Sequence, residues 1–503
     1  MPAPTRPAPR KRPATTPAGA DAPLSILMVA SEAHPFAKTG GLADVVAALP
    51  AALVRLGHRV TVVLPRYRGV SDEGAAFTHT FDFGAATVGV RFIEHRLADG
   101  VTAVLVDVPG LFDRDGLYGS GGRDYPDNAQ RFACLSRAAL EYARVKGERP
   151  SVVHAHDWQA GLVPVYLKTQ FADDPVLGGV PCVFTIHNLA FQGVFASNVL
   201  PSLGLGWEVL NMEALEFWGH ISFLKGGVNF SEKITTVSPT YAREILTPDY
   251  GCGMQGVLAR RASDLVGIIN GIDTARWNPA TDEFVPAHFT AETLAGKRAA
   301  KRALLELVGL PCDDAAMGRP VIGVISRLTD QKGLDLVGAA AEQLMALDAT
   351  WVMLGTGEPH YERLFRAMAA RHPDRVSATI GFDDRLAHFI EAGADTFLMP
   401  SRYEPCGLNQ LYSLRYGTLP IVRATGGLED TVVDESKPGG NGFKFHEYTP
   451  GALIAVVERA LDVYNDQTVW TRLQHSAMQG DPSWDVSARE YVKVYREVMN
   501  GIR

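Results

Sequence analysis

The sequence predicts an α/β protein made of two Rossmann-like, doubly wound domains. The chain has 503 residues, more than one compact core usually holds, since domains contain roughly 100–250 residues. Short apolar runs alternate with segments of helical periodicity in two separate series, which is the pattern of parallel sheets covered by helices. Between the two series, residues 273–287 are rich in Pro, Asp and Thr and are expected to form a connector.

The first series opens with residues 25–30, a short apolar run typical of a buried parallel strand. After a loop at 31–41, apolar residues recur at helical spacing from Leu42 to Leu56, and residues 60–64 form the next strand. This β-loop-α-β unit begins a doubly wound sheet. Pro50 lies inside the helix and is expected to kink it. Further strands are expected at 101–106, 152–155, 183–186 and 234–237.

The second series begins at residue 321. Its strands are expected at 321–326, 351–355, 376–380, 396–400 and 419–423, and helices at 334–347 and 361–371. Residues 488–499 are amphipathic and are expected to pack back across the domain junction. The predicted organisation is a tail at 1–22, an N-terminal domain at 23–272, a C-terminal domain at 273–482 and a final helix at 483–503 that packs on the N-terminal domain.

Composition excludes several classes of protein. The net charge of -8, with no long block of one charge sign outside the first few residues, argues against nucleic-acid binding, which would need a basic face. The longest apolar stretches fall short of the roughly 20 residues that a membrane span needs. The five cysteines are dispersed and include no C-x-x-C pair, so we expect neither a disulfide framework nor a zinc site. Such cysteines suit a reducing compartment, and we therefore expect a cytoplasmic location. The first 22 residues are rich in Pro, Ala and Thr and are expected to be disordered, with a short transit peptide as the alternative.

Two similar segments each place Thr-Gly-Gly just before a predicted helix. The first consists of Thr39, Gly40 and Gly41 and directly follows Lys38; the second consists of Thr425, Gly426 and Gly427. Glycines allow a ligand to approach the backbone, and a helix N-terminus favours negative charge. We therefore expect these two turns to face one another and hold an anion between the domains. The alternative is that each is an ordinary strand-to-helix turn.

Three charged residues follow predicted strands of the second domain. Arg327 and Lys332 lie at the carboxyl end of its first strand, where ligands of open α/β sheets bind. Two fixed cations suit a pyrophosphate, whereas the alternative is a pair of solvated surface charges. Glu404 follows the strand at 396–400 and could hydrogen-bond sugar hydroxyls or stabilise positive charge at a sugar carbon. Its alternative role is an ordinary acidic residue at a helix start.

Polar residues also follow the strands of the first domain. His154 and His156 form an H-x-H pair, but no third ligand accompanies them, so we expect no metal site. Asp157 and His187 are instead expected to contact a sugar in the cleft. The only D-x-D pair is Asp113 and Asp115, in a glycine-rich stretch that we interpret as a loop.

Nine motifs in order resemble those of the bacterial glycogen synthase and plant starch synthase family, and they span almost the whole chain from residue 25. They are KTGGLADVV from Lys38, HAHDWQAGL from His154, TIHNLAFQG from Thr185, FLKGG from Phe223, VSPTYAREI from Val237, NGID from Asn270, SRLTDQKGLDL from Ser326, PSRYEPCGLNQLYSLRYGTLP from Pro400 and TGGLEDTV from Thr425. Each motif alone is modest evidence, but the ordered set is specific.

The resemblance implies a GT-B fold, which consists of two Rossmann-like domains with an interdomain cleft. It implies a retaining glucosyltransferase that uses ADP-glucose, extends glycogen or a maltooligosaccharide, and needs no metal or other cofactor. The N-terminal domain would form the acceptor side and the C-terminal domain the nucleotide-sugar side. Retention without an obvious nucleophile implies attack on the front face, with the leaving phosphate taking the acceptor proton.

The resemblance also assigns roles to single residues. Glu404 would support an oxocarbenium-like transition state, Arg327 and Lys332 would neutralise the leaving pyrophosphate, and His187 and Asp157 would contact the glucose. Further contacts to the donor would come from Lys38, Gly40, Gly41, Asn188, Phe382 (against the adenine), Cys406, Gly407, Leu408, Thr425, Gly426 and Gly427, and Tyr118 would reach the sugar or the acceptor. Many GT-B enzymes carry a second glutamate eight residues after the first. Tyr412 stands there, as is usual in this branch, and we leave it out of the site.

Two other readings remain open at the level of sequence. One is another enzyme of the same fold, with a different nucleotide-sugar donor or with phosphorylase activity, which would require a lysine-bound pyridoxal phosphate. The other is a non-catalytic glucan-binding relative. The presence of Lys38, His187, Arg327, Lys332 and Glu404 argues against the second, because a protein without catalysis could have lost any of them.

Overall fold

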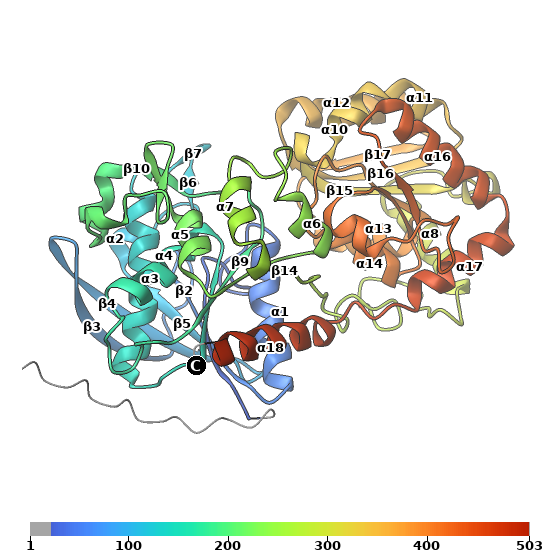
Figure 1. Ribbon diagram of the computed structural model, residues 1–503. Helices are drawn as coiled ribbons and strands as arrows, with labels where there is room; N and C mark the ends of the chain where they lie inside the picture. Colours follow the sequence, from blue (N-terminus) through green and yellow to red (C-terminus); the bar gives the residue numbers. More distant parts are fainter. Residues whose placement is uncertain (1–21, 502–503) are drawn as a thin grey trace, which may run out of the picture.

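The computed structural model describes residues 22–501, which fold into two lobes, each built on a largely parallel sheet with helices on both faces (Figure 1). The prediction of two doubly wound α/β domains is therefore confirmed. The predicted disordered tail lies outside the described residues, apart from residue 22. Within 22–501, no helix has both the length and the apolar character that crossing a membrane would require.

The first sheet has nine strands in the order β14-β13-β9-β8-β1-β2-β5-β4-β3. They are β1 Ser25–Val29, β2 Arg59–Pro65, β3 Ala75–Phe83, β4 Ala86–Arg96, β5 Thr102–Asp107, β8 Val152–His156, β9 Cys182–Ile186, β13 Lys233–Thr236 and β14 Leu265–Gly267. All pairs are parallel except those made by β4 with β3 and β5. Since β1 lies between β2 and β8, the strand order reverses there, and ligands of such sheets bind at that reversal.

The first sheet contains three strands that the sequence pattern did not predict. The β3–β4 hairpin has an exposed face and carries Thr, His and Asp between its apolar residues, so it lacks the apolar runs of the buried strands. Strand β14 is only three residues long and half-buried, and it therefore gives a weak signal.

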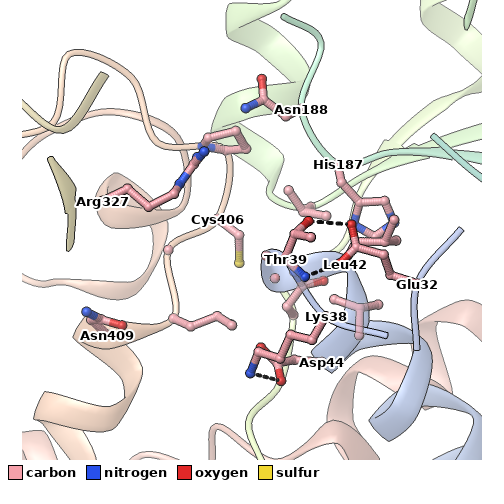
Figure 2. Close-up of a pocket in the computed structure, with 18 of the residues that line it drawn as sticks. Glu32, Lys38, Thr39, Leu42, Asp44, His187, Asn188, Arg327, Cys406 and Asn409 are labelled. Atoms are coloured by element: carbon pink, nitrogen blue, oxygen red, sulfur yellow. Dashed lines mark hydrogen bonds and ion pairs between the residues drawn. The ribbon is translucent and has the colours of Figure 1, made fainter. Parts of the chain in front are cut away.

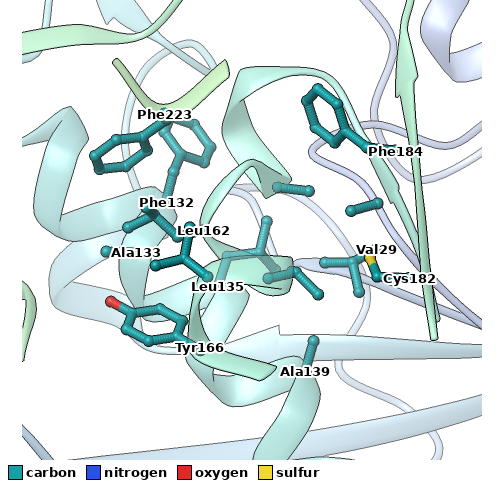
Figure 3. Packing of buried hydrophobic residues seen from close by; sticks show 14 of the residues in the cluster. Val29, Phe132, Ala133, Leu135, Ala139, Leu162, Tyr166, Cys182, Phe184 and Phe223 are labelled. Atoms are coloured by element: carbon teal, nitrogen blue, oxygen red, sulfur yellow. The ribbon is translucent and has the colours of Figure 1, made fainter. Parts of the chain in front are cut away.

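The helices of the first lobe cover both faces of this sheet. They include α1 Gly41–Arg55, α3 Asn128–Lys146, α4 Leu162–Thr169, α5 Phe223–Phe230, α6 Pro239–Glu244 and α7 Gln255–Arg260. Figure 3 shows part of the core, in which Phe132 and Leu135 of α3, Tyr166 of α4 and Phe184 of β9 belong to one cluster of buried residues. Helix α1 continues through the predicted kink site, Pro50, to its end.

The second sheet has six parallel strands in the order β17-β16-β15-β18-β19-β20. They are β15 Val321–Leu328, β16 Thr350–Gly357, β17 Val376–Ile380, β18 Thr396–Met399, β19 Leu419–Arg423 and β20 Phe443–Phe445. In chain order this is 3-2-1-4-5-6, the arrangement of dinucleotide-binding Rossmann domains. The strand order reverses between β15 and β18, so the loops after these two strands are placed to hold a ligand.

The second lobe also has helices on both sides of its sheet. They include α8 Ala295–Leu307, α10 Leu334–Ala339, α11 Ala341–Ala346, α12 Pro359–Arg371, α13 Asp384–Gly393, α14 Asn409–Arg415, α15 Gly426–Thr431, α16 Pro450–Tyr464 and α17 Gln467–Met478. The single helix expected at 334–347 is interrupted at Ala340 and forms α10 and α11. Gly338 lies two residues before the break and lowers the local helix propensity.

The last helix, α18 (Trp484–Gly501), leaves the second lobe and lies along the first (Figure 1). Its buried face, which includes Trp484, Tyr491 and Tyr495, shares an apolar core with Met28 of β1 and Leu49 of α1. Burial of each large apolar side chain contributes roughly 1.5–3 kcal/mol. The final helix thus completes the core of the first lobe.

Candidate active site

The two lobes enclose a cleft with a volume of about 1640 Å³, and both sheets contribute the loops at their carboxyl ends to its lining. This exceeds the roughly 300–1,000 Å³ of a pocket for a drug-sized molecule. It therefore offers room for a nucleotide-sugar together with the end of a second substrate. Of the predicted site residues, all line this cleft except Thr425, Gly426 and Gly427.

The loop after β1 presents Lys38 to the cleft and is held by two acidic residues (Figure 2). Glu32 accepts hydrogen bonds from the backbone N–H of Thr39 at 2.5 Å and from its hydroxyl at 2.6 Å, and also from the hydroxyl of Tyr118. Lys38 Nζ lies 2.7 Å from Asp44 Oδ1. The sequence reading missed Glu32 and Asp44 as members of the site, although Asp44 lies within the KTGGLAD motif.

His187 and Asp157 meet at the ends of β8 and β9. The Asp157 carboxylate accepts a hydrogen bond from the His187 backbone N–H at 2.7 Å. Burial of this carboxyl raises its pKa to about 7. Asp157 also has a positive φ of 55°, a conformation that costs free energy in a residue other than glycine and recurs at functional sites. Asn188, the next residue in the chain, lines the cleft beside them.

Behind His187 lies a network of buried histidines. His187 Nε2 is 3.0 Å from His156 Nδ1, and the rings of His154 and His156 lie 4.0 Å apart. His154 in turn contacts the Tyr495 hydroxyl of α18 at 2.8 Å through Nδ1 and the Thr185 hydroxyl at 2.6 Å through Nε2. Burial lowers the pKa of His154 and of His187 to about 3, so both rings are neutral at physiological pH.

The second lobe contributes an ion pair to the opposite wall. Lys332 Nζ lies 2.6 Å from Glu404 Oε2, which also accepts a hydrogen bond from Ser401 Oγ at 3.0 Å. Arg327 lies on β15 itself, exposed to the cleft. Gly333 has a positive φ of 73°, and a Cβ there would overlap the carbonyl oxygen of Pro400. Only glycine allows the Lys332 loop to approach the end of β18 so closely.

The remaining predicted donor contacts of this lobe lie where a nucleotide-sugar could reach them. Gly407 and Leu408 line the cleft with Cys406, whose burial raises the thiol pKa to about 12 and keeps it protonated. Phe382 follows β17, and its side chain is 87% exposed, so one ring face is free to stack on a base.

The second Thr-Gly-Gly turn differs from its predicted position on the cleft wall. Thr425, Gly426 and Gly427 are buried behind the Glu404 loop, and Glu244 of α6 accepts hydrogen bonds from Thr425 Oγ1 at 2.9 Å and from the Gly426 N–H at 3.0 Å. A Cβ at position 426 would overlap the Glu404 carbonyl oxygen. The glycines therefore serve close packing beneath the loop, and a carboxylate from the first lobe takes the place of the predicted anion.

Two aromatic residues of the cleft were not predicted as members of the site. The Trp277 ring, from the connector, stacks on Tyr412 with ring centroids 4.0 Å apart and on His388 at 3.9 Å. Both Trp277 and Tyr412 line the cleft. Tyr412 was left out because it stands where many GT-B enzymes carry a second glutamate, which made its contact to the ribose uncertain. Only the fold brings Trp277 beside it.

The two aspartates of the D-x-D pair form ion pairs with an arginine. Asp113 and Asp115 both pair with Arg68, at 2.7 Å and 2.5 Å. Within residues 22–501, one group of potential ligand atoms lies together, formed by Asp330, Glu358 and His360. None of these three residues lines the cleft.

Comparisons with known proteins assign the chain to a family. Residues 25–260 match the starch synthase catalytic domain, and residues 314–472 match the glycosyl transferases of group 1. The chain is 52% identical over 475 residues to the glycogen synthase of Anaeromyxobacter dehalogenans, which covers 94% of this chain and 99% of that protein. The chain belongs to the glycogen and starch synthase family. A second family member, the glycogen synthase of Koribacter versatilis, is 46% identical to this chain, and the match covers 94% of this chain and 98% of that protein.

Solved structures agree with the family assignment. The catalytic domain of starch synthase IV from Arabidopsis thaliana, bound to ADP and acarbose, is 34% identical with a TM-score of 0.87, and the match covers 95% of this chain and all of that one. Sucrose-phosphate synthase from Thermosynechococcus elongatus shares the fold at 18% identity and a TM-score of 0.60, with 95% and 99% coverage. The predicted GT-B architecture of the family is thereby confirmed.

Proposed function

We propose that this protein is a glycogen synthase, which transfers glucose from ADP-glucose to the non-reducing end of an α-1,4-glucan with retention of configuration and releases ADP. One observation carries the proposal. Cations from both lobes, Lys38 on one side and Arg327 and Lys332 on the other, line the same cleft as the Lys332–Glu404 pair and the Asp157–His187 pair. Such a cleft can bind a nucleotide diphosphate and a sugar side by side.

The chemistry follows from where charge develops. When the bond between glucose C1 and the diphosphate oxygen breaks, both electrons leave with ADP, so negative charge grows on the phosphate and positive charge on C1. Arg327, Lys332 and Lys38 stabilise the first charge, and the carboxylate of Glu404 stabilises the second. Because Lys332 holds Glu404 at 2.6 Å, the carboxylate is oriented before the substrate binds.

The acceptor hydroxyl then attacks C1 from the face that the phosphate leaves. A new C1–O bond forms, and the hydroxyl proton passes to the departing phosphate oxygen, so no protein nucleophile is needed and the configuration is retained. Asp157 and His187 orient the glucose through its hydroxyl groups. Positioning of this kind can supply several kcal/mol of the barrier reduction, up to roughly 7–11 kcal/mol in the best cases.

The assignment of substrates to the lobes is part of the same proposal. Residues 23–272 would form the acceptor side, and residues 273–482 the nucleotide-sugar side, where the exposed Phe382 ring would contact the adenine. We also propose a cytoplasmic location, because five dispersed cysteines suit a reducing compartment.

The deciding experiment measures incorporation of labelled glucose into glycogen, with ADP-glucose and UDP-glucose compared side by side in the presence of EDTA. We expect incorporation from ADP-glucose that EDTA does not reduce, and release of the added glucose by an α-1,4-specific glucosidase. A faster reaction with UDP-glucose would overturn the choice of donor. No incorporation from either donor by folded protein would overturn the transferase, and a pyridoxal absorbance in the same sample would indicate a phosphorylase instead.

A further inference from the structure

A set of direct hydrogen bonds joins the lobes beside the cleft, between the region of α6 in the first lobe and that of α15 in the second. Figure 1 places α6 at the border of the two lobes. Ser238 Oγ donates to the Pro405 carbonyl at 2.7 Å, and Thr240 donates to the Asp430 carboxylate through both its backbone N–H and its hydroxyl, each at 2.7 Å. Glu244 completes the set through Thr425 and Gly426. We call these contacts the α6–α15 seam.

The seam connects directly to the backbone that carries Glu404. The Gly427 N–H donates to the Glu404 carbonyl at 3.1 Å, and Gly426 packs so closely on the same carbonyl that no other side chain would fit. The Ser238 bond ends on the next residue of the loop, Pro405. A shift of α15 relative to the first lobe would therefore move the main chain of Glu404.

Glu244 is the charged member of the seam that contacts the turn beneath this loop. Its Oε1 accepts two hydrogen bonds, one from the Thr425 hydroxyl and one from the Gly426 N–H, and its Oε2 lies 3.2 Å from the same N–H. Hydrogen bonds to a carboxylate are roughly twice as strong as those between neutral groups. The Glu244 side chain is half-buried in this contact, which restricts the other conformations that it can adopt.

We infer that Glu244 is a positioning residue for glucosyl transfer, which fixes α15 against the first lobe and thereby sets the Glu404 carboxylate against the wall that carries Lys38 and His187. This inference rests on the proposed transferase function. It predicts an effect on the chemical step rather than on donor binding, because Glu244 lies outside the cleft lining while Glu404 acts on the charge that develops at C1. Small displacements of a catalytic group cost large factors in rate.

The test replaces Glu244 by glutamine in the full chain and measures kcat and KM for ADP-glucose. We expect Glu244→Gln to lower kcat about tenfold, with KM within about twofold of the wild type. The matched control is Glu232→Gln. Glu232 also accepts a hydrogen bond from a backbone N–H, that of Cys182 at 2.7 Å, but both groups belong to the first lobe. The control should keep the wild-type kcat.

A double variant separates positioning from general loss of structure. If Glu244 acts through Glu404, adding Glu244→Gln to Glu404→Gln should lower kcat by less than about twofold further, because two residues that act as one unit are not additive. A full tenfold further loss in the double variant would overturn the inference. An unchanged kcat in Glu244→Gln, or an equal fall of kcat in Glu232→Gln, would also overturn it. The same holds if Glu244→Gln has a lowered thermal midpoint and regains the wild-type kcat on cooling.

The wild-type protein, assayed in the same experiment, keeps the two proposals distinguishable. If it transfers no glucose, the proposed function fails, and the role of Glu244 in that function fails with it. If the wild type is active and Glu244→Gln is equally active, only the positioning role fails.

Discussion

At the scale of single residues, Glu404 is held by Lys332 at 2.6 Å and by Ser401 at 3.0 Å on a loop that faces the cleft. We expect Glu404→Gln to lower kcat by about 10²–10³, the range seen when one preorganised electrostatic group is removed. Lys332→Met should cause a loss of similar size, since it removes a cation from the leaving group and releases Glu404. Steady-state kinetics on glycogen check both.

The control for these variants is Lys493→Ala on α18, which breaks an exposed ion pair with Glu490; neither residue lines the cleft. It should keep wild-type rates, since exposed pairs contribute only about 0–1 kcal/mol. All three variants should remain folded at the assay temperature, which thermal unfolding checks. A wild-type kcat in folded Glu404→Gln would remove Glu404 from the mechanism.

The carboxyl of Asp157 provides a test by pH. Burial raises its pKa to about 7, so the protonated form predominates below that pH and the carboxylate above it. If the carboxylate binds the sugar, kcat/KM, which reports the free enzyme, should rise with pH and level off above about pH 8. His187 does not contribute to this change, because its pKa of about 3 keeps it neutral throughout.

The variant Asp157→Asn separates this residue from other titrating groups. It should lower kcat/KM at every pH and abolish the rise near pH 7, measured between pH 5.5 and 9. If the variant shows the same rise as the wild type, another group titrates there, and Asp157 does not control the reaction.

Much of this residue-level picture could be predicted because Lys38, Lys332 and Glu404 each follow a buried strand, and parallel strands bring their carboxyl ends together. The position of Thr425 could not. A Thr-Gly-Gly turn has the same sequence whether its N–H groups face a ligand or a carboxylate, and Glu244 lies 181 residues away in the chain. Glu32 was missed for a similar reason, since its bonds to Thr39 and Tyr118 exist only after the loops fold together.

At the scale of elements, α18 contributes a polar contact as well as an apolar face to the first lobe. The Tyr495 hydroxyl contacts His154 Nδ1 at 2.8 Å, and both side chains are fully buried. We expect Tyr495→Phe to destabilise the protein by about 1–3 kcal/mol, because it leaves a buried nitrogen without a partner. Unfolding by heat or urea measures the change.

A substitution on the exposed face of the same helix provides the control. Val486 is 44% exposed, and Val486→Thr should leave the unfolding transition within about 0.5 kcal/mol of the wild type. If Tyr495→Phe is equally harmless, the hydroxyl does not stabilise the buried histidines, and the apolar face of α18 alone holds it in place.

The elements that could be predicted were those whose pattern follows from burial. Strands β1, β8 and β15 are buried and read as apolar runs, and α18 shows one apolar face. The β3–β4 hairpin was missed because the prediction relied on continuous apolar runs, whereas its residues alternate between buried and exposed, which is the pattern of a half-exposed strand. The break between α10 and α11 depends on packing, which the periodicity of the segment does not reveal.

At the scale of the whole molecule, each lobe supplies only part of the phosphate-binding charge. Lys38 pairs with Asp44 within the first lobe, and Arg327 and Lys332 belong to the second. We expect ADP-glucose to draw the lobes together by rotation about the α6–α15 seam, which stays intact, because only the closed form would place all three cations around one diphosphate. Small-angle X-ray scattering should show a smaller radius of gyration with saturating donor than without it.

The double variant Arg327→Ala/Lys332→Ala is the matched control, since it removes the second lobe's share of the charge. Its scattering should change little on addition of donor. Identical wild-type profiles with and without saturating donor would mean that the cleft binds its substrate without closing.

The position of α18 on the first lobe determines when the core of that lobe can be completed during synthesis. A ribosome produces β1 and α1 long before Trp484 to Gly501, so the hydrophobic layer against Met28 and Leu49 stays open while the residues between them are made. In the finished fold, Arg496 of α18 lies 3.4 Å from the carbonyl of Ala22, beside the start of β1. A circularly permuted gene that encodes α18 directly ahead of β1 would let the first lobe close before the second is translated.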